Sequence, residues 1–392
     1  MDSRIYWFVA VFGYIIQTKC LSIVQWTVRD SGRPGIDHQG VSIFLSFMYF
    51  VPWLLLVPCA RLVSLASSFT GSRPMTPELR TIDETNGIMD NDNNNNNNNS
   101  GNSNGNGVGN YNNYDNGVKR NDVFGKLVYA VKLAVLSLLL LVVIFSYMNS
   151  LSLTPAFDVA LIQNTSIFEI TSLLYGVCGL SRRKNVFRNF VVMMIALVGI
   201  VLVSYTKATC DLLAGKFSIN QKTGELEDPF LFDRLKSCLL CGLGALALGP
   251  FTVLWNRWFN YSDRVTLSHQ CQHLTYIASI CMAAFLPFLP RALSTMAKVP
   301  TSKVFWLQAL AAVLFGTLPH VFSLSLIQRQ TLPSYSTTIN LGAIIFMGIT
   351  DWICEPTQTT IVRWEVIGYI MLSVSCVVLS IAYYEKKHIP LY

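Results

Sequence analysis

Long apolar stretches, separated by short polar or basic segments, run through almost the whole chain. Ten of them are about as long as the ~20 residues with which an α-helix crosses a bilayer. The pattern predicts an all-α integral membrane protein with ten transmembrane helices, at residues 5–26, 41–66, 125–147, 154–179, 188–206, 237–257, 270–290, 304–327, 333–354 and 365–384. An even number of spans places both ends of the chain on the same side of the membrane.

Residues 67–122 contrast with these runs, because Asn, Gly and Ser dominate their centre. Such a composition cannot bury enough apolar surface to fold. We expect a disordered loop here, inserted into a first set of five helices at residues 1–206. A second loop, residues 207–236, leads to a second set of five helices and a short tail at residues 237–392.

Basic residues indicate how the chain is oriented. Cytosolic loops of membrane proteins carry an excess of Lys and Arg, and the short loop SRRKNVFR at residues 181–188 is the clearest such cluster. This excess is satisfied when the N-terminus lies in the cytosol. We therefore expect both termini and the Asn-rich loop on the cytosolic side.

Composition agrees with a membrane protein and excludes another class. Hydrophobic residues make up 52% of the chain and charged residues 13%, against about 25% charged residues in a typical soluble domain. The net charge is +7, but the basic residues form short clusters between apolar runs, so no nucleic-acid partner is expected. The lipid bilayer is the expected surrounding, and the sequence leaves homo-oligomerisation open.

The two halves of the chain are faintly similar. A gapless alignment of residues 153–207 with residues 332–386 gives identities at Leu153, Ile170, Thr171, Val198, Tyr205 and Lys207. Helices four and five thereby overlay helices nine and ten. Because each repeat has an odd number of helices, the halves would have opposite orientations in the membrane. Two inverted five-helix repeats are typical of transporters, whose substrate site lies between the repeats.

Two carboxylates lie inside the fourth predicted span. Asp158 and Glu169 are costly at membrane depth, and such residues usually mark a functional site. Helical geometry places them on one face, roughly 16 Å apart along the axis, together with Thr165 and Ser172. We interpret this polar face as the lining of a transport path, with Glu169 as the proton-coupling group. A structural hydrogen bond for Glu169 and simple hydration of Asp158 stay open as alternatives.

The ninth predicted span begins with a polar segment, in which six of the seven side chains from Ser334 to Asn340 are able to form hydrogen bonds. Thr337 and Asn340 are candidate binding residues, although Ser and Thr also join neighbouring helices. His320 in the eighth span is a third candidate, with a packing role as the alternative. Tyr147 and Asn149, where the third span meets the fourth, are candidates for the mouth of the path on the non-cytosolic side.

Signatures of enzymes and metal sites are missing from the sequence. His269 and His273 share a helix face that Cys271 does not, so the three do not converge on a metal ion. No phosphate-binding G-x-x-x-x-G-K-[ST] loop and no catalytic cluster can be recognised. We expect no enzymatic activity, no metal and no cofactor.

One segment carries a family resemblance. Residues 150–208 combine a polar fourth helix, a short basic loop and a fifth helix with the phrase Gly-Ile-Val-Leu-Val-Ser at Gly199 to Ser204. Its counterpart in the second half is LPSYSTTINLGAIIFMGITDW at residues 332–352. Together they resemble the drug/metabolite transporter superfamily, which includes the EamA-type and solute carrier family 35 proteins. The resemblance implies ten helices in two inverted repeats, with both termini cytosolic.

The same resemblance implies a function. It favours a secondary transporter that moves a small polar metabolite by alternating access in an endomembrane, such as the vacuole, Golgi or ER. Residues 336–342 lack the lysine that is frequent in nucleotide-sugar carriers of the family, which favours its F-type fungal members. The alternative is a non-transporting membrane receptor or scaffold that uses the Asn-rich loop as a docking element.

Overall fold

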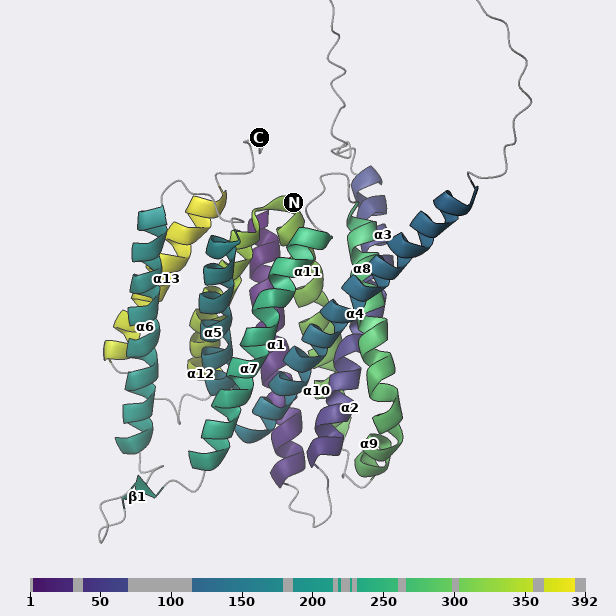
Figure 1. Ribbon diagram of the computed structural model, residues 1–392. Coiled ribbons are helices and arrows are strands. Elements are labelled where there is room, and N and C mark those ends of the chain that lie inside the picture. The colour runs from purple at the N-terminus through teal and green to yellow at the C-terminus, as the bar shows by residue number, and fades with distance from the viewer. Residues whose placement is uncertain are drawn as a thin grey trace, which may run out of the picture. The chain divides into compact units, whose positions relative to one another are not determined.

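The computed structural model is helical through nearly all of its described part. It describes residues 3–30, 38–69, 115–178, 186–213, 218–219, 226–227, 231–259, 266–297, 303–354 and 363–384. Contacts divide the chain into a large unit, residues 1–61 with 132–392, and a small unit, residues 62–131 (Figure 1). A single antiparallel pair of strands is described, β1 (Ser218–Ile219) with β2 (Leu226–Glu227).

The helices follow the predicted spans in order. The first five spans are α1 (Ser3–Asp30), α2 (His38–Phe50) with η1 (Val51–Leu55) and α3 (Leu56–Phe69), α4 (Asp115–Leu153), α5 (Ala156–Val177) and α6 (Val186–Leu213). The second five are α7 (Leu231–Trp258), α8 (Leu267–Phe285) with η2 (Leu286–Phe288) and α9 (Leu289–Met296), α10 (Lys303–Ala311) with η3 (Ala312–Thr317) and α11 (Leu318–Gln330), η4 (Pro333–Ser336) with α12 (Thr337–Cys354), and α13 (Arg363–Tyr384).

Each of the ten predicted runs overlaps one of these helical segments. Among the described residues, nine segments are long and apolar enough to cross a membrane, and α5 is a tenth helix outside that set. The prediction of an all-helical, multi-pass membrane protein is therefore confirmed; ten spans were expected, and the described residues form nine to ten long apolar helices. Most of the predicted Asn-rich loop lies outside the described residues, as do residues 214–217, 220–225 and 228–230 of the loop predicted at residues 207–236. The described residues of that second loop extend α6 and α7 or form β1 and β2.

Proline explains why two spans are interrupted. A proline inside a helix removes a backbone donor and clashes with the preceding turn. In the second span, Pro52 lies at the start of the 3₁₀ turn η1, and in the seventh, Pro287 lies at the start of η2. The eighth span is interrupted in a different way, because its helix widens into the π-helical turn η3.

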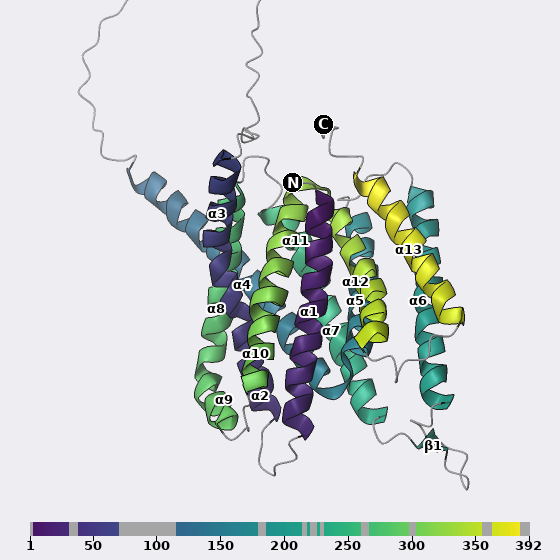
Figure 2. The ribbon, with the colours of Figure 1, turned by 180° about the vertical axis from the view of Figure 1, so that it is seen from behind.

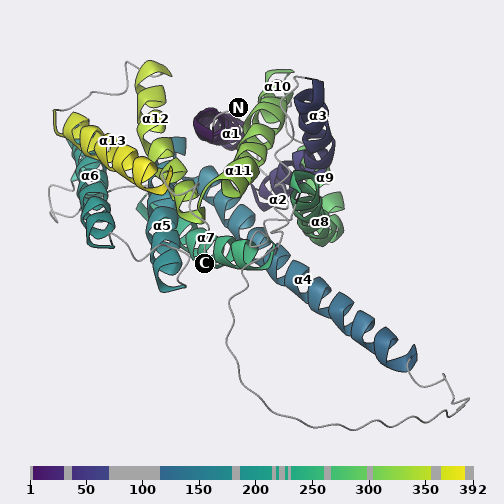
Figure 3. The same ribbon diagram turned by 90° about the horizontal axis from the view of Figure 1, so that it is seen from above.

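The helices of the large unit pack in distinct groups. α1 contacts α10, η3, α11 and α12, whereas α2 contacts α8 and α9. α5 contacts α7 and α12, and α6 contacts α13 (Figure 3). Seen from behind, α1 lies between α10–α11 and α12 (Figure 2). The buried residues of α1, α5, α6, α12 and α13 form one apolar core, with Phe168, Leu341 and Leu372 fully buried.

Glycine permits the closest approaches between helices. A Cβ atom on Gly316 of η3 would lie 2.7 Å from the Cα atom of Gln17 in α1, and one on Gly13 would lie 2.9 Å from the carbonyl oxygen of Gly316. Gly199 of α6 and Gly368 of α13 face each other in the same way. The close approaches at Gly13 and Gly316 bring α1 against η3 and α11.

Candidate functional site

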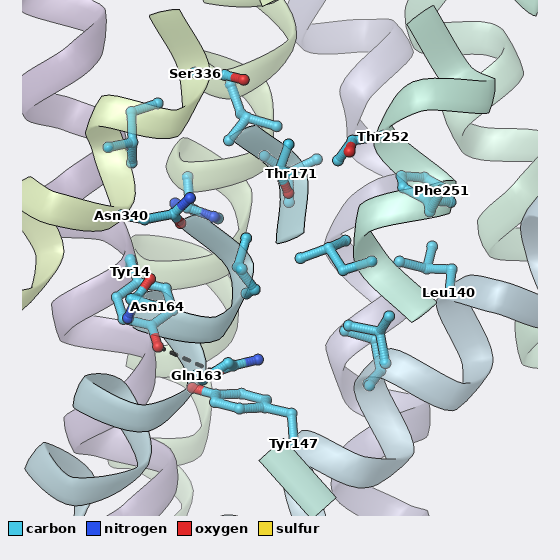
Figure 4. A pocket seen from close by; sticks show the side chains of 18 of the residues that line it. Tyr14, Leu140, Tyr147, Gln163, Asn164, Thr171, Phe251, Thr252, Ser336 and Asn340 are labelled. Carbon is cyan, nitrogen blue, oxygen red and sulfur yellow. Dashed lines mark hydrogen bonds between the residues drawn. The ribbon is translucent and has the colours of Figure 1, made fainter. Parts of the chain in front are cut away.

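A cavity of about 160 Å³ lies between the helices of the large unit (Figure 4). α1, α4, α5, α7, α11 and α12 provide most of its lining. The hydrogen-bonding side chains of the lining are Tyr14, Gln17, Tyr49, Trp53, Tyr147, Gln163, Asn164, Thr171, Thr252, Trp255, His320, Ser325, Gln328, Ser336, Thr337 and Asn340. The remaining lining residues are apolar, and no Asp, Glu, Lys or Arg is among them.

A hydrogen-bonded group joins three helices at one end of the cavity. The Tyr14 hydroxyl donates to Oε1 of Gln163 at 3.1 Å, which links α1 to α5 (Figure 4). The Tyr147 hydroxyl of α4 donates to Oγ1 of Thr18 at 2.8 Å, and Thr18 in turn donates to the carbonyl oxygen of Tyr14 at 2.8 Å. Buried polar side chains that are bonded in this way hold their helices in one register.

His320 is held against α1. Its Nδ1 lies 2.7 Å from the carbonyl oxygen of Ala10, and its ring centroid lies 5.7 Å from that of Tyr14. Because a carbonyl oxygen only accepts, Nδ1 carries the proton, and Nε2 of the neutral ring is left as an acceptor. The predicted candidate His320 therefore lines the cavity and also packs between helices.

The polar start of the ninth span lies beside α1 and α5 and lines the same cavity. Thr337 donates to the carbonyl oxygen of Ser334 at 2.7 Å, and Thr338 accepts a hydrogen bond of 3.0 Å from Nε1 of Trp7 in α1. Asn340, one turn further along α12, also lines the cavity. Thus Thr337, Asn340 and His320, all predicted from the sequence, come together at one cavity.

The predicted polar face of α5 lies elsewhere. Asp158, Thr165, Glu169 and Ser172 are all partly exposed, and none of them lines the cavity. The cavity face of α5 instead presents Gln163, Asn164, Ile167 and Thr171. Periodicity identifies the residues that share a face of a helix, but it does not say which face packs inward.

An ion pair inside the large unit was not foreseen. Lys19 of α1 and Asp351 of α12 form a salt bridge, with side chains 20% and 14% exposed. A second pair, Arg29 Nη2 with Asp233 Oδ2 at 3.0 Å, joins the end of α1 to the start of α7. A lone charge within an apolar run is the signal that could have revealed both Lys19 and Asp351.

The chemistry of the site is that of neutral hydrogen bonding. Within the described ranges, no three His, Cys, Asp or Glu side chains converge as metal ligands would. The cavity combines carboxamides, hydroxyls and indoles with an apolar wall. Such a lining can hold an uncharged molecule or water.

Comparison with known proteins gives a consistent picture. The sequence model of a family described as "Ceramide synthase regulator" matches residues 1–383. The chain is also 45% identical, over 413 aligned positions, to the "Mannosyl phosphorylinositol ceramide synthase regulatory protein CSG2" of Saccharomyces cerevisiae, covering 99% of this chain and 100% of the relative. One solved structure, described only as "Crystal structure of protein", covers 98% of both chains at 10% identity and a TM-score of 0.49, too low to bear on function.

These matches overturn several expectations. The predicted membership of the drug/metabolite transporter superfamily is wrong, and so are the transporter function and the small-molecule substrate that it implied. The error arose because polar residues in apolar helices and a loose helical pattern occur in regulators as well as in carriers. The family description is that of a regulator of an enzyme, which favours the non-transporting alternative. The chain belongs to the ceramide synthase regulator family.

Proposed function

We propose that this chain is a membrane-embedded regulatory subunit of a mannosyl phosphorylinositol ceramide synthase. One observation carries the proposal, the 45% identity to a regulatory protein of that synthase over almost the full length of both chains. The many apolar helices support it, because a subunit that acts on a lipid-modifying enzyme has to meet it in the bilayer. The enzyme replaces the small metabolite as the expected partner.

The partly exposed polar face of α5 is the proposed contact with the enzyme. Glu169 is partly exposed near the middle of the helix, where a carboxylate in contact with lipid is unfavourable. A transmembrane helix of the enzyme with a basic or hydroxyl-bearing side chain would cover Glu169 and Ser172. Polar contacts of this kind stabilise helix pairs in membranes by about 1 kcal/mol each.

The Asn-rich segment is a second proposed contact. It lies outside the described residues, so its support is compositional: a long polar segment binds partners by ordering on contact. Deletion of residues 85–117 should then reduce the amount of enzyme that copurifies. Replacing the same residues with a Gly/Ser segment of equal length separates the sequence of the loop from its length.

We also propose two inverted repeats of five helices, with both termini in the cytosol of an endomembrane. The helix contacts support this proposal. If each span is replaced by its counterpart in the other half, so that span one becomes span six and span nine becomes span four, a contacting pair of helices maps onto another contacting pair. The contact of α1 with α12 corresponds to that of α7 with α5. The contact of α1 with α11 corresponds to that of α7 with α4, where Ser150 Oγ donates to the carbonyl oxygen of Ser237 at 3.1 Å. The spans broken by Pro52 and Pro287 are also five positions apart.

Complementation tests the proposed function. The chain is expressed in yeast cells that lack the regulatory relative, and mannosyl phosphorylinositol ceramide synthase activity is measured in their membranes together with copurification of the enzyme. We expect both to be restored. If activity stays at the level of the deletion strain while the chain is well expressed in the membrane, the proposal is wrong.

Variants of α5 test the contact. Glu169→Leu should lower the copurified enzyme about tenfold, equivalent to about 1.4 kcal/mol, and Glu169→Gln should lower it less, because the amide still forms hydrogen bonds. Ser279→Leu, a polar-to-apolar change at an exposed position of α8, is the matched control and should have no effect. Equal copurification of all three variants would place the contact elsewhere.

A further inference from the structure

The cavity has two chemically different walls. One wall, from α4 and α7, is mainly apolar: Leu140, Val143, Ile144, Leu248 and Phe251 outnumber Tyr147, Thr252 and Trp255. The opposite wall, from α1, α5 and α12, presents hydrogen-bonding groups such as Asn164 and Asn340 (Figure 4). A ligand that satisfies both walls has an apolar part and a polar part.

The lining also selects by charge. No Asp, Glu, Lys or Arg belongs to it, so an ionic ligand would find no opposite charge there. A buried charge without a partner is strongly unfavourable. Phosphate-bearing lipids, nucleotides and ammonium compounds are therefore poor ligands for this cavity, whereas neutral amphiphiles are suited to it.

Three deeply buried polar atoms of the lining form no hydrogen bond with the described residues. They are Oε1 of Gln17, Nε1 of Trp53 and Oγ1 of Thr171. Their residues are 2%, 5% and 3% exposed. Buried polar groups nearly always have a partner, and here the missing ones are an acceptor for the indole N–H and a donor for the amide oxygen. A hydroxyl group or a secondary amide supplies both.

Size restricts the ligand further. An apolar cavity of about 150 Å³ in another protein admits a benzene molecule, and this cavity measures about 160 Å³. It therefore admits a small polar head and the adjoining carbons, and it excludes two complete acyl chains.

We infer that the cavity binds the neutral head of a ceramide-type lipid, which carries a secondary amide and hydroxyl groups, as a regulatory ligand. The neutral amphiphilic class follows from the cavity. The choice of ceramide within that class rests on the proposed function, in which the chain controls an enzyme of ceramide-based lipids. Occupancy of the cavity then follows the ceramide content of the surrounding bilayer.

Direct binding tests this inference without the enzyme. The full-length chain is purified in detergent and titrated with N-hexanoyl ceramide, or with the 1-phosphate of the same lipid, while tryptophan fluorescence and thermal unfolding are followed. Trp53 and Trp255 line the cavity and serve as internal probes. Ceramide should bind at least tenfold more tightly than its phosphate. Equal or tighter binding of the phosphate overturns the inference, as does the absence of any ceramide binding.

Variants locate the binding. Gln17→Leu and Thr171→Val should each weaken ceramide binding at least tenfold, whereas Gln272→Leu, at an exposed position of α8, should leave it unchanged. Thr171→Val keeps the shape of the side chain, so it decides the question if Gln17→Leu does not fold. Unchanged affinity in Thr171→Val means that the cavity holds water only and overturns the inference. Because the enzyme is not present, a failure here is distinct from a failure of complementation.

Discussion

Lys19 and Asp351 show what a single pair of residues contributes at membrane depth. Their ion pair joins α1 to α12, and both side chains are mostly buried. Removing one partner of such a pair leaves an uncompensated charge, whereas replacing both with apolar residues is often neutral or stabilising. The contribution of the pair is therefore measured by a double-mutant cycle rather than by either single substitution.

We expect Lys19→Met to destabilise the folded protein by about 3–5 kcal/mol, because Asp351 then loses the opposite charge that Lys19 supplies. The double substitution Lys19→Met, Asp351→Leu should recover most of the lost stability. Thermal unfolding of the purified protein in detergent measures both. Asp233→Asn, at the more exposed pair with Arg29, is the comparison and should cost about 1 kcal/mol or less, because Arg29 keeps its hydrogen bonds to the carbonyl oxygens of Ser152 and Leu153. An equal loss of stability at the two ion pairs would contradict the deeper burial of the Lys19–Asp351 pair.

Residue patterns also show how far the site could be predicted. The rarity of polar side chains in apolar helices predicts Thr337, Asn340 and His320 as site residues, and all three line the cavity. Gln17 and Gln163 are also polar side chains in apolar helices, but they are not predicted as site residues, because the carboxylates Asp158 and Glu169 are the more costly groups at membrane depth. A carboxylate draws attention by its charge, yet the lining is made of neutral groups.

At the scale of helices, the crossing of α6 and α13 depends on glycine. A Cβ atom on Gly368 would lie 2.7 Å from Cγ2 of Val203 and 2.9 Å from the carbonyl oxygen of Gly199. The backbone oxygen cannot move aside without displacing the whole helix. Small residues permit this kind of close contact in membranes, where packing rather than water drives helix association.

Gly368→Val should therefore separate α6 from α13 and destabilise the protein by about 1–3 kcal/mol, the usual range for an overpacked core. Gly242→Val is the matched control, because a Cβ atom at Gly242 meets no other atom within 4 Å. The measurement is a disulfide cross-link between cysteines placed on the two helices, together with thermal unfolding. An unchanged cross-linking rate in Gly368→Val would show that the contact is not formed.

The positions of the helices were predictable because membrane spans are long and strongly apolar. Their packing was not, since a helix surrounded by lipid is apolar on its outer face as well. On α5, the partly exposed face carries Asp158 and Glu169 while the buried face carries Gln163 and Asn164. Both faces are polar, so polarity alone could not distinguish them.

For the whole molecule, the ribbon places the start of α1 and the end of α13 at the same end of the large unit (Figure 1). This agrees with an even number of crossings, in which α5 counts as the tenth. If the termini face the cytosol, the loop at residues 207–236 faces the lumen and the loop between α7 and α8 faces the cytosol.

Glycosylation mapping tests this topology. Lys222→Thr completes an Asn-x-Thr sequon at Asn220, and we expect this variant to gain one N-linked glycan, because acceptor sites are modified on the luminal side. The natural sequon at Asn260 should stay unmodified in the same chain. The readout is an endoglycosidase-sensitive mobility shift on a gel. A glycan at Asn260 together with none at Asn220 would invert the orientation.

The family assignment belongs to this largest scale and was beyond the reach of the sequence pattern. Helix count, orientation and a faint internal repeat constrain an architecture, and one architecture serves many functions. The 45% identity to a known regulator rests instead on residues spread along the whole chain. None of them needs to stand out for its chemistry.

The pairing of α6 with α13 has a consequence for biosynthesis. About 150 residues separate the two helices, which a ribosome adds in about 8–30 s at roughly 5–20 residues per second. During that time the glycine-lined face of α6 contacts lipid or a chaperone instead of Gly368. Premature termination before residue 363 leaves that face permanently without its partner, which would mark the truncated chain for membrane quality control.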